Sequence, residues 1–203
     1  MTLMLGNTLL SVAETETALN TCDFSTLQKP AKNKGERGLR IEKELGINNS
    51  SRLIDLIDGE LKSFTIGESI AVTQLSHCLP EIIQQSVEFD DSKVARKLSQ
   101  VIYIGFTRSN EYVGNITINK DTHSEYYQYL AEDYGYISAM IRYFYLEGRE
   151  LRTITGPNRF LQIRTKDYKT KRGTYTPLCY NDIQLKNKLM AFYHPSNFGR
   201  IIL

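Results

Sequence analysis

The sequence predicts an α/β domain in which a mixed central sheet is flanked by helices. Short apolar, β-branched runs such as Val101–Phe106 are typical of buried strands. Residues 123–147 instead carry apolar side chains at three- and four-residue steps, as an amphipathic helix does. These strand and helix patterns follow one another along the chain in an order that favours the α/β class.

Length and composition are those of a soluble globular protein. The 203 residues fit one domain, or one domain with a small second lobe, and 41% of them are hydrophobic. No apolar run approaches the roughly 20 residues of a membrane helix, and the first ten residues lack the basic start of a signal peptide. Three cysteines without metal-ligand spacing indicate reduced thiols. We therefore expect a cytoplasmic protein that does not bind membranes.

The first half of the chain predicts one helix followed by short strands. Residues 1–33 are polar and mixed, with a short helix at about 8–19. A stronger helix is expected at about 36–45, because Gly46 is placed to end it. Further elements are expected as strands at about 52–57, 60–66 and 69–75, and as a basic turn or short helix at 93–98.

The second half predicts a buried strand, a long helix and a hairpin. The strand is Val101–Phe106, and the helix at 123–147 is expected to end at Gly148. Residues 151–155 and 159–163 are expected to form the hairpin, since Gly156, Pro157 and Asn158 between them favour a turn. Residues 188–193 and 198–203 form two last short elements.

Charge is distributed unevenly, although the net charge is only +2. Residues 29–43 and 164–172 are both rich in lysine and arginine. Two such clusters can line one phosphate-binding cleft, or they can be two solvated loops.

An acidic constellation is expected around one tight turn. With Asp58 and Gly59 as the turn of a hairpin, alternation places Asp55, Glu60 and Lys62 on one face. Two close carboxylates repel each other, and a divalent cation such as Mg²⁺ relieves that repulsion. The set then suits phosphodiester hydrolysis, with the lysine stabilising charge on the phosphate. The alternative is a solvent-facing hairpin with an ordinary Asp–Lys ion pair.

The preceding helix adds a third acid. Glu42 lies in the apolar arc of the helix, between Leu39 and Leu45. A buried carboxylate needs a cation or a strong donor, which a metal shared with Asp55 and Glu60 provides. The alternative is a glutamate at the margin of the arc that reaches water.

These residues carry a family resemblance. The run Lys34-Gly-Glu-Arg-Gly-Leu-Arg-Ile-Glu42, followed by Asp55 and Glu60-Leu-Lys62, resembles the MutH mismatch-repair nickase and its GATC-cutting restriction-enzyme relatives in the PD-(D/E)XK nuclease superfamily. Three later segments resemble the same family in order: Val94-x-x-Lys97-Leu98, then Arg152-x-Ile-Thr with Phe160-Leu-Gln-Ile-Arg164-x-Lys166, then Ala191-Phe-Tyr193 with Asn197-Phe198. The similarity spans about residues 34–203 and leaves 1–33 as an N-terminal extension.

The resemblance implies a restriction-endonuclease-like fold with two lobes around a DNA cleft. The catalytic lobe would be about 34–120 and the DNA-recognition elements about 150–203. Roles are implied residue by residue: Glu42, Asp55 and Glu60 as Mg²⁺ ligands, Lys62 as the catalytic lysine, Lys97 near the scissile phosphate, and Lys34, Arg164, Lys166 and Tyr193 as DNA contacts. Asp55 lies five residues before Glu60 where the family usually has seven, so Asp58 is the alternative third ligand.

The expected function is therefore a Mg²⁺-dependent type II restriction endonuclease acting on double-stranded DNA. The alternative within the family is a repair endonuclease that nicks the unmethylated strand of hemimethylated DNA. The first implies a cognate DNA methyltransferase and the second a MutL partner, and either leaves open a monomer in solution or a dimer on DNA. Two further hypotheses are a DNA-binding module without activity and a Mg²⁺ enzyme acting on another phosphoester.

Overall fold

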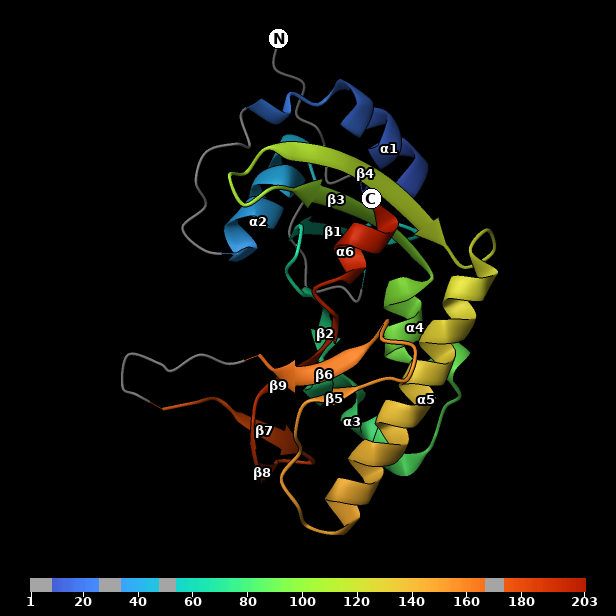
Figure 1. Cartoon of the computed structure of the whole chain (residues 1–203), viewed down its shortest axis with the longest axis vertical. Coiled ribbons are helices and arrows are strands. Elements are labelled where there is room, and N and C mark those ends of the chain that lie inside the picture. The colour runs from blue at the N-terminus through green and yellow to red at the C-terminus, as the bar shows by residue number, and fades with distance from the viewer. Residues whose placement is uncertain (1–8, 26–33, 48–53, 167–173) are drawn as a thin grey trace.

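The computed structural model describes residues 9–25, 34–47, 54–166 and 174–203, with the backbone alone at 34 and 35. Helices and strands are interspersed along this part of the chain, and its last third is mostly strands (Figure 1). The helices are α1 (Val12–Thr21), α2 (Lys34–Glu44), α3 (Leu75–Gln84), η2 (Phe89–Asp91), α4 (Lys93–Leu98), α5 (Ser124–Leu146) and α6 (Phe198–Ile202). The strands are β1 (Glu60–Thr65), β2 (Ile70–Gln74), β3 (Gln100–Phe106), β4 (Tyr112–Asn119), β5 (Ile154–Thr155), β6 (Gln162–Thr165), β7 (Pro177–Tyr180), β8 (Ile183–Lys188) and β9 (Met190–His194).

A mixed three-stranded sheet forms one end of the molecule, with β3 between β1 and β4. β1 runs parallel to β3, and β4 runs antiparallel to it. Nearly every residue of β3 is buried, because the strand packs on both faces. Val101 and Tyr103 enter the larger hydrophobic core, whereas Ile102 and Ile104 enter a smaller one.

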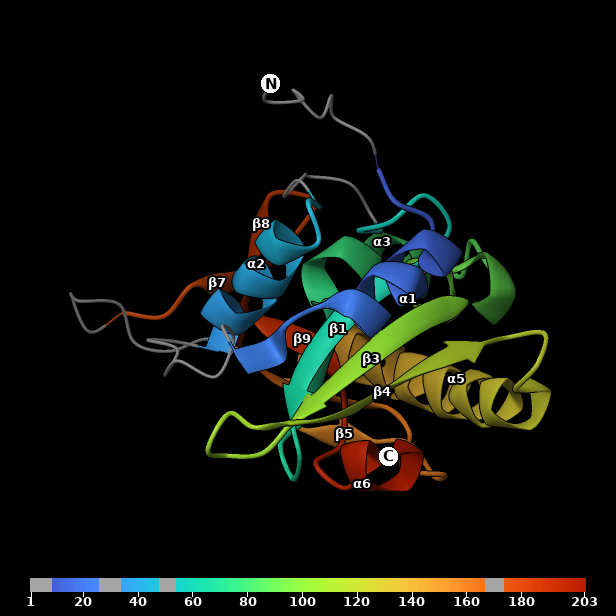
Figure 2. The ribbon, with the colours of Figure 1, turned by 90° about the horizontal axis from the view of Figure 1, so that it is seen from above.

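The smaller core lies between this sheet and the helices α1 and α2, which lie at the same end of the molecule (Figures 1 and 2). Ser11 caps α1, since its hydroxyl accepts from the Glu14 amide while the Glu14 carboxylate accepts from the Ser11 amide. Val12 of α1 and Ile41 of α2 are buried in this core. The edge strand β1 therefore has α2 beside it.

The larger core fills the rest of the molecule, around a four-stranded sheet in the order β2-β9-β6-β5. All three pairings in this sheet are antiparallel. The long helix α5 buries Leu130, Ile137 and Ile141 and ends at Leu146, two residues before Gly148, whose φ of +60° favours glycine. β7 and β8 form a separate two-stranded sheet.

The α/β class and most predicted elements are confirmed. α2, α4, α5, β1, β2, β3, β9 and α6 lie where the sequence predicts them, and the turn at Gly156–Asn158 joins β5 and β6. The prediction of a single central sheet is wrong, because the described residues form three sheets. The strand expected at about 52–57 is also wrong for residues 54–57, which form a bend, while 52 and 53 lie outside the described residues.

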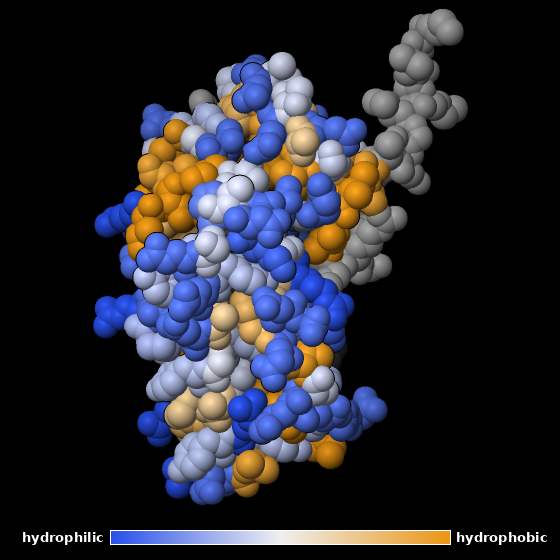
Figure 3. Space-filling model, turned by 90° about the vertical axis from the view of Figure 1, so that its right-hand side faces the viewer, coloured by the Kyte–Doolittle hydropathy of each residue, from blue (hydrophilic) through white to orange (hydrophobic). Residues whose placement is uncertain are grey.

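The surface seen from the α5 side is mostly hydrophilic, with apolar patches in its upper half (Figure 3). No helix within the described ranges is long and apolar enough to cross a membrane. The cysteines Cys22, Cys78 and Cys179 are all described, and each is a free thiol.

Candidate active site

The start of β1 places an acid and a lysine on the same face of the sheet. Glu60 pairs in register with Val101 and Lys62 with Tyr103, so both side chains face the larger core. Glu60 is only 1% exposed, and the Lys62 ammonium donates to its Oε1. A buried carboxylate is thereby paired, as its burial requires.

Asp55 reaches Glu60 from the bend before β1. The Asp55 amide donates to Glu60 Oε2 at 3.3 Å, and the Leu61 amide donates to Asp55 Oδ2 at 3.4 Å. Each carboxylate thus accepts a hydrogen bond from a backbone amide at, or next to, the other acid. The proximity of Asp55 to Glu60 agrees with the prediction, although it does not come from the predicted hairpin.

The hairpin itself is wrong by one residue. The Leu56 amide donates to the Gly59 carbonyl at 2.9 Å, so Gly59 closes the bend instead of forming its tip. Gly59 is required there for space and not for a positive φ, because a Cβ would lie 2.5 Å from Val12 Cγ2 and 2.8 Å from the Gln100 carbonyl oxygen. Asp58, the alternative ligand, accepts from the Val12 amide at 2.7 Å and so binds the first turn of α1.

Glu42 comes to the same acids from α2, along the edge of β1. Burial, and then the charge of Asp55, raise the pKa of Glu42, with a smaller increase from Glu60 and an opposing effect of Lys62. Burial and the charge of Glu60 likewise raise the pKa of Asp55, against Lys62 and Lys97. Glu42 and Asp55 are therefore close enough to a neighbouring carboxylate for their own ionisation to be disfavoured.

The apolar arc predicted for this helix needs a correction. Ile41 is fully buried, but Leu39 is 49% exposed. Glu42 consequently lies at the boundary of the buried side and not at its centre, half-buried between the core and the acids.

Two lysines from separate segments contact Glu60, and a third lies near those two lysines. Lys97 of α4 donates to Glu60 Oε1 at 2.8 Å, the same oxygen that Lys62 contacts. Lys166 follows β6, and its amide donates to the Leu189 carbonyl at 2.9 Å. Burial lowers the pKa of Lys166, and the positive charges of Lys62 and Lys97 lower it further. Two ammonium groups thus lie among the three carboxylates, and that of Lys166 lies near both of them.

Two predicted DNA contacts lie on neighbouring strands. The Arg164 guanidinium of β6 is 5.4 Å from the centroid of the Tyr193 ring of β9, and it also donates to Ser69 Oγ at 3.0 Å. Arg164 is exposed and Tyr193 half-buried. Lys34 begins α2, but its side chain lies outside the described residues, as do 29–33 and 167–172 of the two basic clusters.

The donors of the acidic cluster fit Mg²⁺ in chemical type. Carboxylate oxygens are the ligands that this ion prefers, and the mutual repulsion seen at Glu42 and Asp55 is what a cation relieves. Across the described ranges, however, no three His, Cys, Asp or Glu side chains are arranged to hold a metal ion. Glu60 Oε1 is instead held by two ammonium groups. Binding by all three acids therefore requires side-chain movement from these positions.

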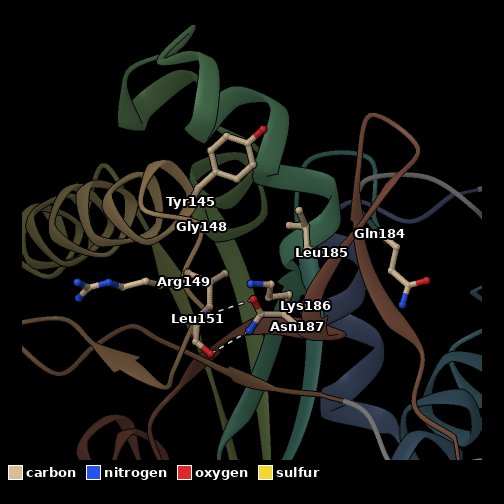
Figure 4. A pocket seen from close by; sticks show the side chains of 8 residues that line it. All are labelled: Tyr145, Gly148, Arg149, Leu151, Gln184, Leu185, Lys186 and Asn187. Atoms are coloured by element: carbon tan, nitrogen blue, oxygen red, sulfur yellow. Dashed lines mark hydrogen bonds between the residues drawn. The ribbon is translucent and has the colours of Figure 1, made fainter.

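A pocket of about 230 Å³ lies away from this cluster, between the end of α5 and β8 (Figure 4). Tyr145, Leu151 and Leu185 contribute to its lining, and Asn187 makes two hydrogen bonds to the backbone of Leu151. None of the predicted site residues lines it. It is also smaller than most small-molecule sites, so it does not compete with the acidic cluster as the site.

Two residues beside the cluster had no sequence signal. Tyr103 and His194 are buried next to Glu60 and Lys62, and both are indistinguishable from ordinary core residues in the sequence. Asp133, by contrast, stands between Leu130 and Tyr134 in the apolar arc of α5, where the argument used for Glu42 would have found it. Its carboxylate accepts from the amides of Asn158, Phe160 and Leu161, so its role is to hold the β5–β6 turn.

Comparison with known proteins adds no relative: no protein-family model matches the chain, and no curated protein matches it significantly. The resemblance to the MutH family therefore stays a prediction that rests on the quoted motifs.

Proposed function

We propose that the chain is a Mg²⁺-dependent endonuclease that hydrolyses phosphodiester bonds of double-stranded DNA at a short specific sequence, as type II restriction enzymes do. The observation that supports the proposal is the gathering of Glu42, Asp55 and Glu60 with Lys62 and Lys97 at the start of β1. Carboxylates for a cation and ammonium groups for a phosphate are the two requirements of this chemistry.

Each group has a distinct task in this proposal. Glu42, Asp55 and Glu60 would hold Mg²⁺, and the ion would supply Lewis acidity for the phosphate and a lowered pKa for the attacking water. Lys62 and Lys97 hold their ammonium groups at Glu60 Oε1, from which they can pair with phosphate oxygens and stabilise the negative charge that grows there. Lys166 holds a backbone phosphate beside them, since it lies close to both lysines.

Arg164 and Tyr193 supply the contacts that recognise the sequence. The exposed guanidinium can donate two parallel hydrogen bonds to guanine in the major groove. The Tyr193 ring faces this guanidinium in a cation–π contact, which orients the Arg164 side chain. The nickase hypothesis uses the same groups and differs in cutting one strand.

The test is digestion of DNA that contains many short palindromes. Phage DNA, with and without adenine methylation, is incubated with the protein in Mg²⁺ or in a chelator, and the fragment ends are sequenced. We expect Mg²⁺-dependent fragments with one common terminal sequence. Nicks in a single strand would favour the repair endonuclease, and uncut DNA at every condition would refute the nuclease proposal.

A substitution separates catalysis from DNA binding. Lys62→Ala should lower the cleavage rate by about 10²-fold or more while DNA affinity stays near that of the wild type. Lys186→Ala is the matched control, because it removes an exposed lysine of β8 far from Glu60. Normal cleavage by Lys62→Ala would show that the acidic cluster is not the active site.

A further inference from the structure

A buried hydrogen-bonded chain connects the two larger sheets directly behind the acidic cluster. His194, at the end of β9, is completely buried. Its Nε2 lies 2.9 Å from the Tyr103 hydroxyl of β3, and its Nδ1 lies 2.8 Å from the Phe160 carbonyl oxygen. The imidazole also stacks on the Phe198 ring, with centroids 4.0 Å apart. Its orientation is therefore fixed on three sides.

The proton positions in this chain follow from its partners. A carbonyl oxygen can only accept, so Nδ1 of His194 carries the hydrogen and donates to Phe160. Nε2 of a neutral imidazole is then an acceptor, and the Tyr103 hydroxyl donates to it. Burial lowers the pKa of His194 to about 4, which keeps the ring neutral near pH 7. Tyr103 is thus the donor and His194 the acceptor in the first bond, and His194 is the donor and Phe160 the acceptor in the second.

The two ends of the chain belong to the two functional parts of the molecule. Tyr103 is the register partner of Lys62, and the charge of Glu60 contributes to its raised pKa after burial. His194 directly follows Tyr193 on β9, and β9 pairs with β6, on which Arg164 lies opposite Ala191. One hydrogen bond thus joins the strand beside the catalytic groups to the strand that carries the recognition groups.

We propose that the Tyr103–His194 hydrogen bond positions β1 and its reacting groups relative to the recognition strands β9 and β6. This inference rests on the proposed endonuclease function. DNA bound by Arg164 and Tyr193 then reaches Lys62 and Glu60 at a fixed distance, so that binding energy is used to orient the scissile phosphate. Tyr103 and His194 are positioning residues, since both are buried and neither can contact DNA.

A positioning role predicts a loss of rate without a loss of affinity. Tyr103→Phe removes only the hydroxyl and keeps the ring in the core. We expect kcat to fall by about tenfold, as removal of outer-shell partners of active-site groups commonly does, while KM for DNA is unchanged. Tyr134→Phe is the matched control, because it removes another buried hydroxyl of the same core, near Glu81 instead of Glu60.

A second variant tests the bond itself. His194→Asn can still donate to the Phe160 carbonyl but is too short to accept from Tyr103. We expect the same fall in kcat, and the double variant with Tyr103→Phe should show no further fall in kcat, since the bond between Tyr103 and His194 is already lost in either single variant. The melting temperature of each variant is measured alongside, so that a loss of folded protein is not counted as a loss of rate.

The outcomes distinguish this inference from the function on which it rests. If the wild type cuts DNA and Tyr103→Phe cuts with the same kcat, or if Tyr134→Phe loses as much, the positioning role is overturned and the endonuclease stands. Multiplying losses in the double variant would overturn it as well. If the wild type cuts no DNA, both proposals fall.

Discussion

The buried imidazole of His194 makes protein stability depend on pH in a defined window. The pKa of a free histidine is 6.5, and in the folded protein burial lowers that of His194 to about 4. The unfolded chain therefore binds one more proton than the folded chain between these values, and the free energy of unfolding falls as the pH falls. The contribution is fully present above pH 6.5 and is lost by about pH 4. With 1.36 kcal/mol for each pKa unit, the loss is about 3 kcal/mol in total, and about 2 kcal/mol is lost by about pH 5.

The assay is urea denaturation of the wild type and His194→Gln in the same series of buffers. Glu42 and Asp55 act in the opposite direction, because their raised pKa values make the folded chain take up protons first as the pH falls. The difference between wild type and variant cancels these contributions. We expect that difference to change by about 1.4 kcal/mol per pH unit between 6.5 and 4. His123→Gln, which removes a histidine that is not fully buried, should keep the wild-type slope.

Equal slopes for the wild type and His194→Gln would refute this reasoning. That result would mean that the imidazole is protonated in the folded protein, so that Nε2 cannot accept from Tyr103. A smaller slope of unfolding free energy against pH in His123→Gln would show that the pH dependence does not come from His194 alone.

Three further predictions concern the acidic cluster, the β5–β6 turn and the DNA contacts. Asp55→Asn should raise the free energy of unfolding at neutral pH by about 0.5–2 kcal/mol, because burial and Glu60 disfavour the ionised form; a lower value in urea denaturation would contradict this. Asp133→Ala should lower it by at least about 3 kcal/mol, since three backbone amides lose their acceptor, and a loss below about 1 kcal/mol would show that water replaces it. Arg164→Ala should weaken binding to the recognised sequence by about 1–3 kcal/mol and leave the affinity for unrelated DNA nearly unchanged, as measured by fluorescence anisotropy; an equal loss on both DNAs would make this side chain a phosphate contact instead.

Sequence reasoning located most elements because their signals are local. The unbroken apolar run of β3 and the regular steps of α5 each identify an element from within one window of sequence. The failure at Asp58 and Gly59 has a different cause. Their dipeptide favours a tight turn with both residues at its tip. The observed bend is one residue earlier, because Val12 and Gln100 pack closely against Gly59 and the Val12 amide donates to Asp58. Contacts between distant segments overrode the local preference.

The candidate site divides in the same way. Glu60 and Lys62 share a face in any strand, so their proximity follows from alternation alone. That Lys166 lies near Lys62 depends instead on contacts between segments far apart in sequence, which no local pattern encodes. The sequence predicts Asp55 beside Glu60 by way of a hairpin. In the structure the two acids do lie together, but two hydrogen bonds to backbone amides hold the pair instead.

The balance of charge around Glu60 has a practical consequence. Lys62 and Lys97 both pair with Glu60, so the most deeply buried carboxylate of the cluster is already compensated without any ion. A protein of this kind can complete its folding in a chelating buffer, unlike small domains whose core is built around a metal. It could then be purified and stored in that state, and divalent cations could be supplied at the moment an assay begins.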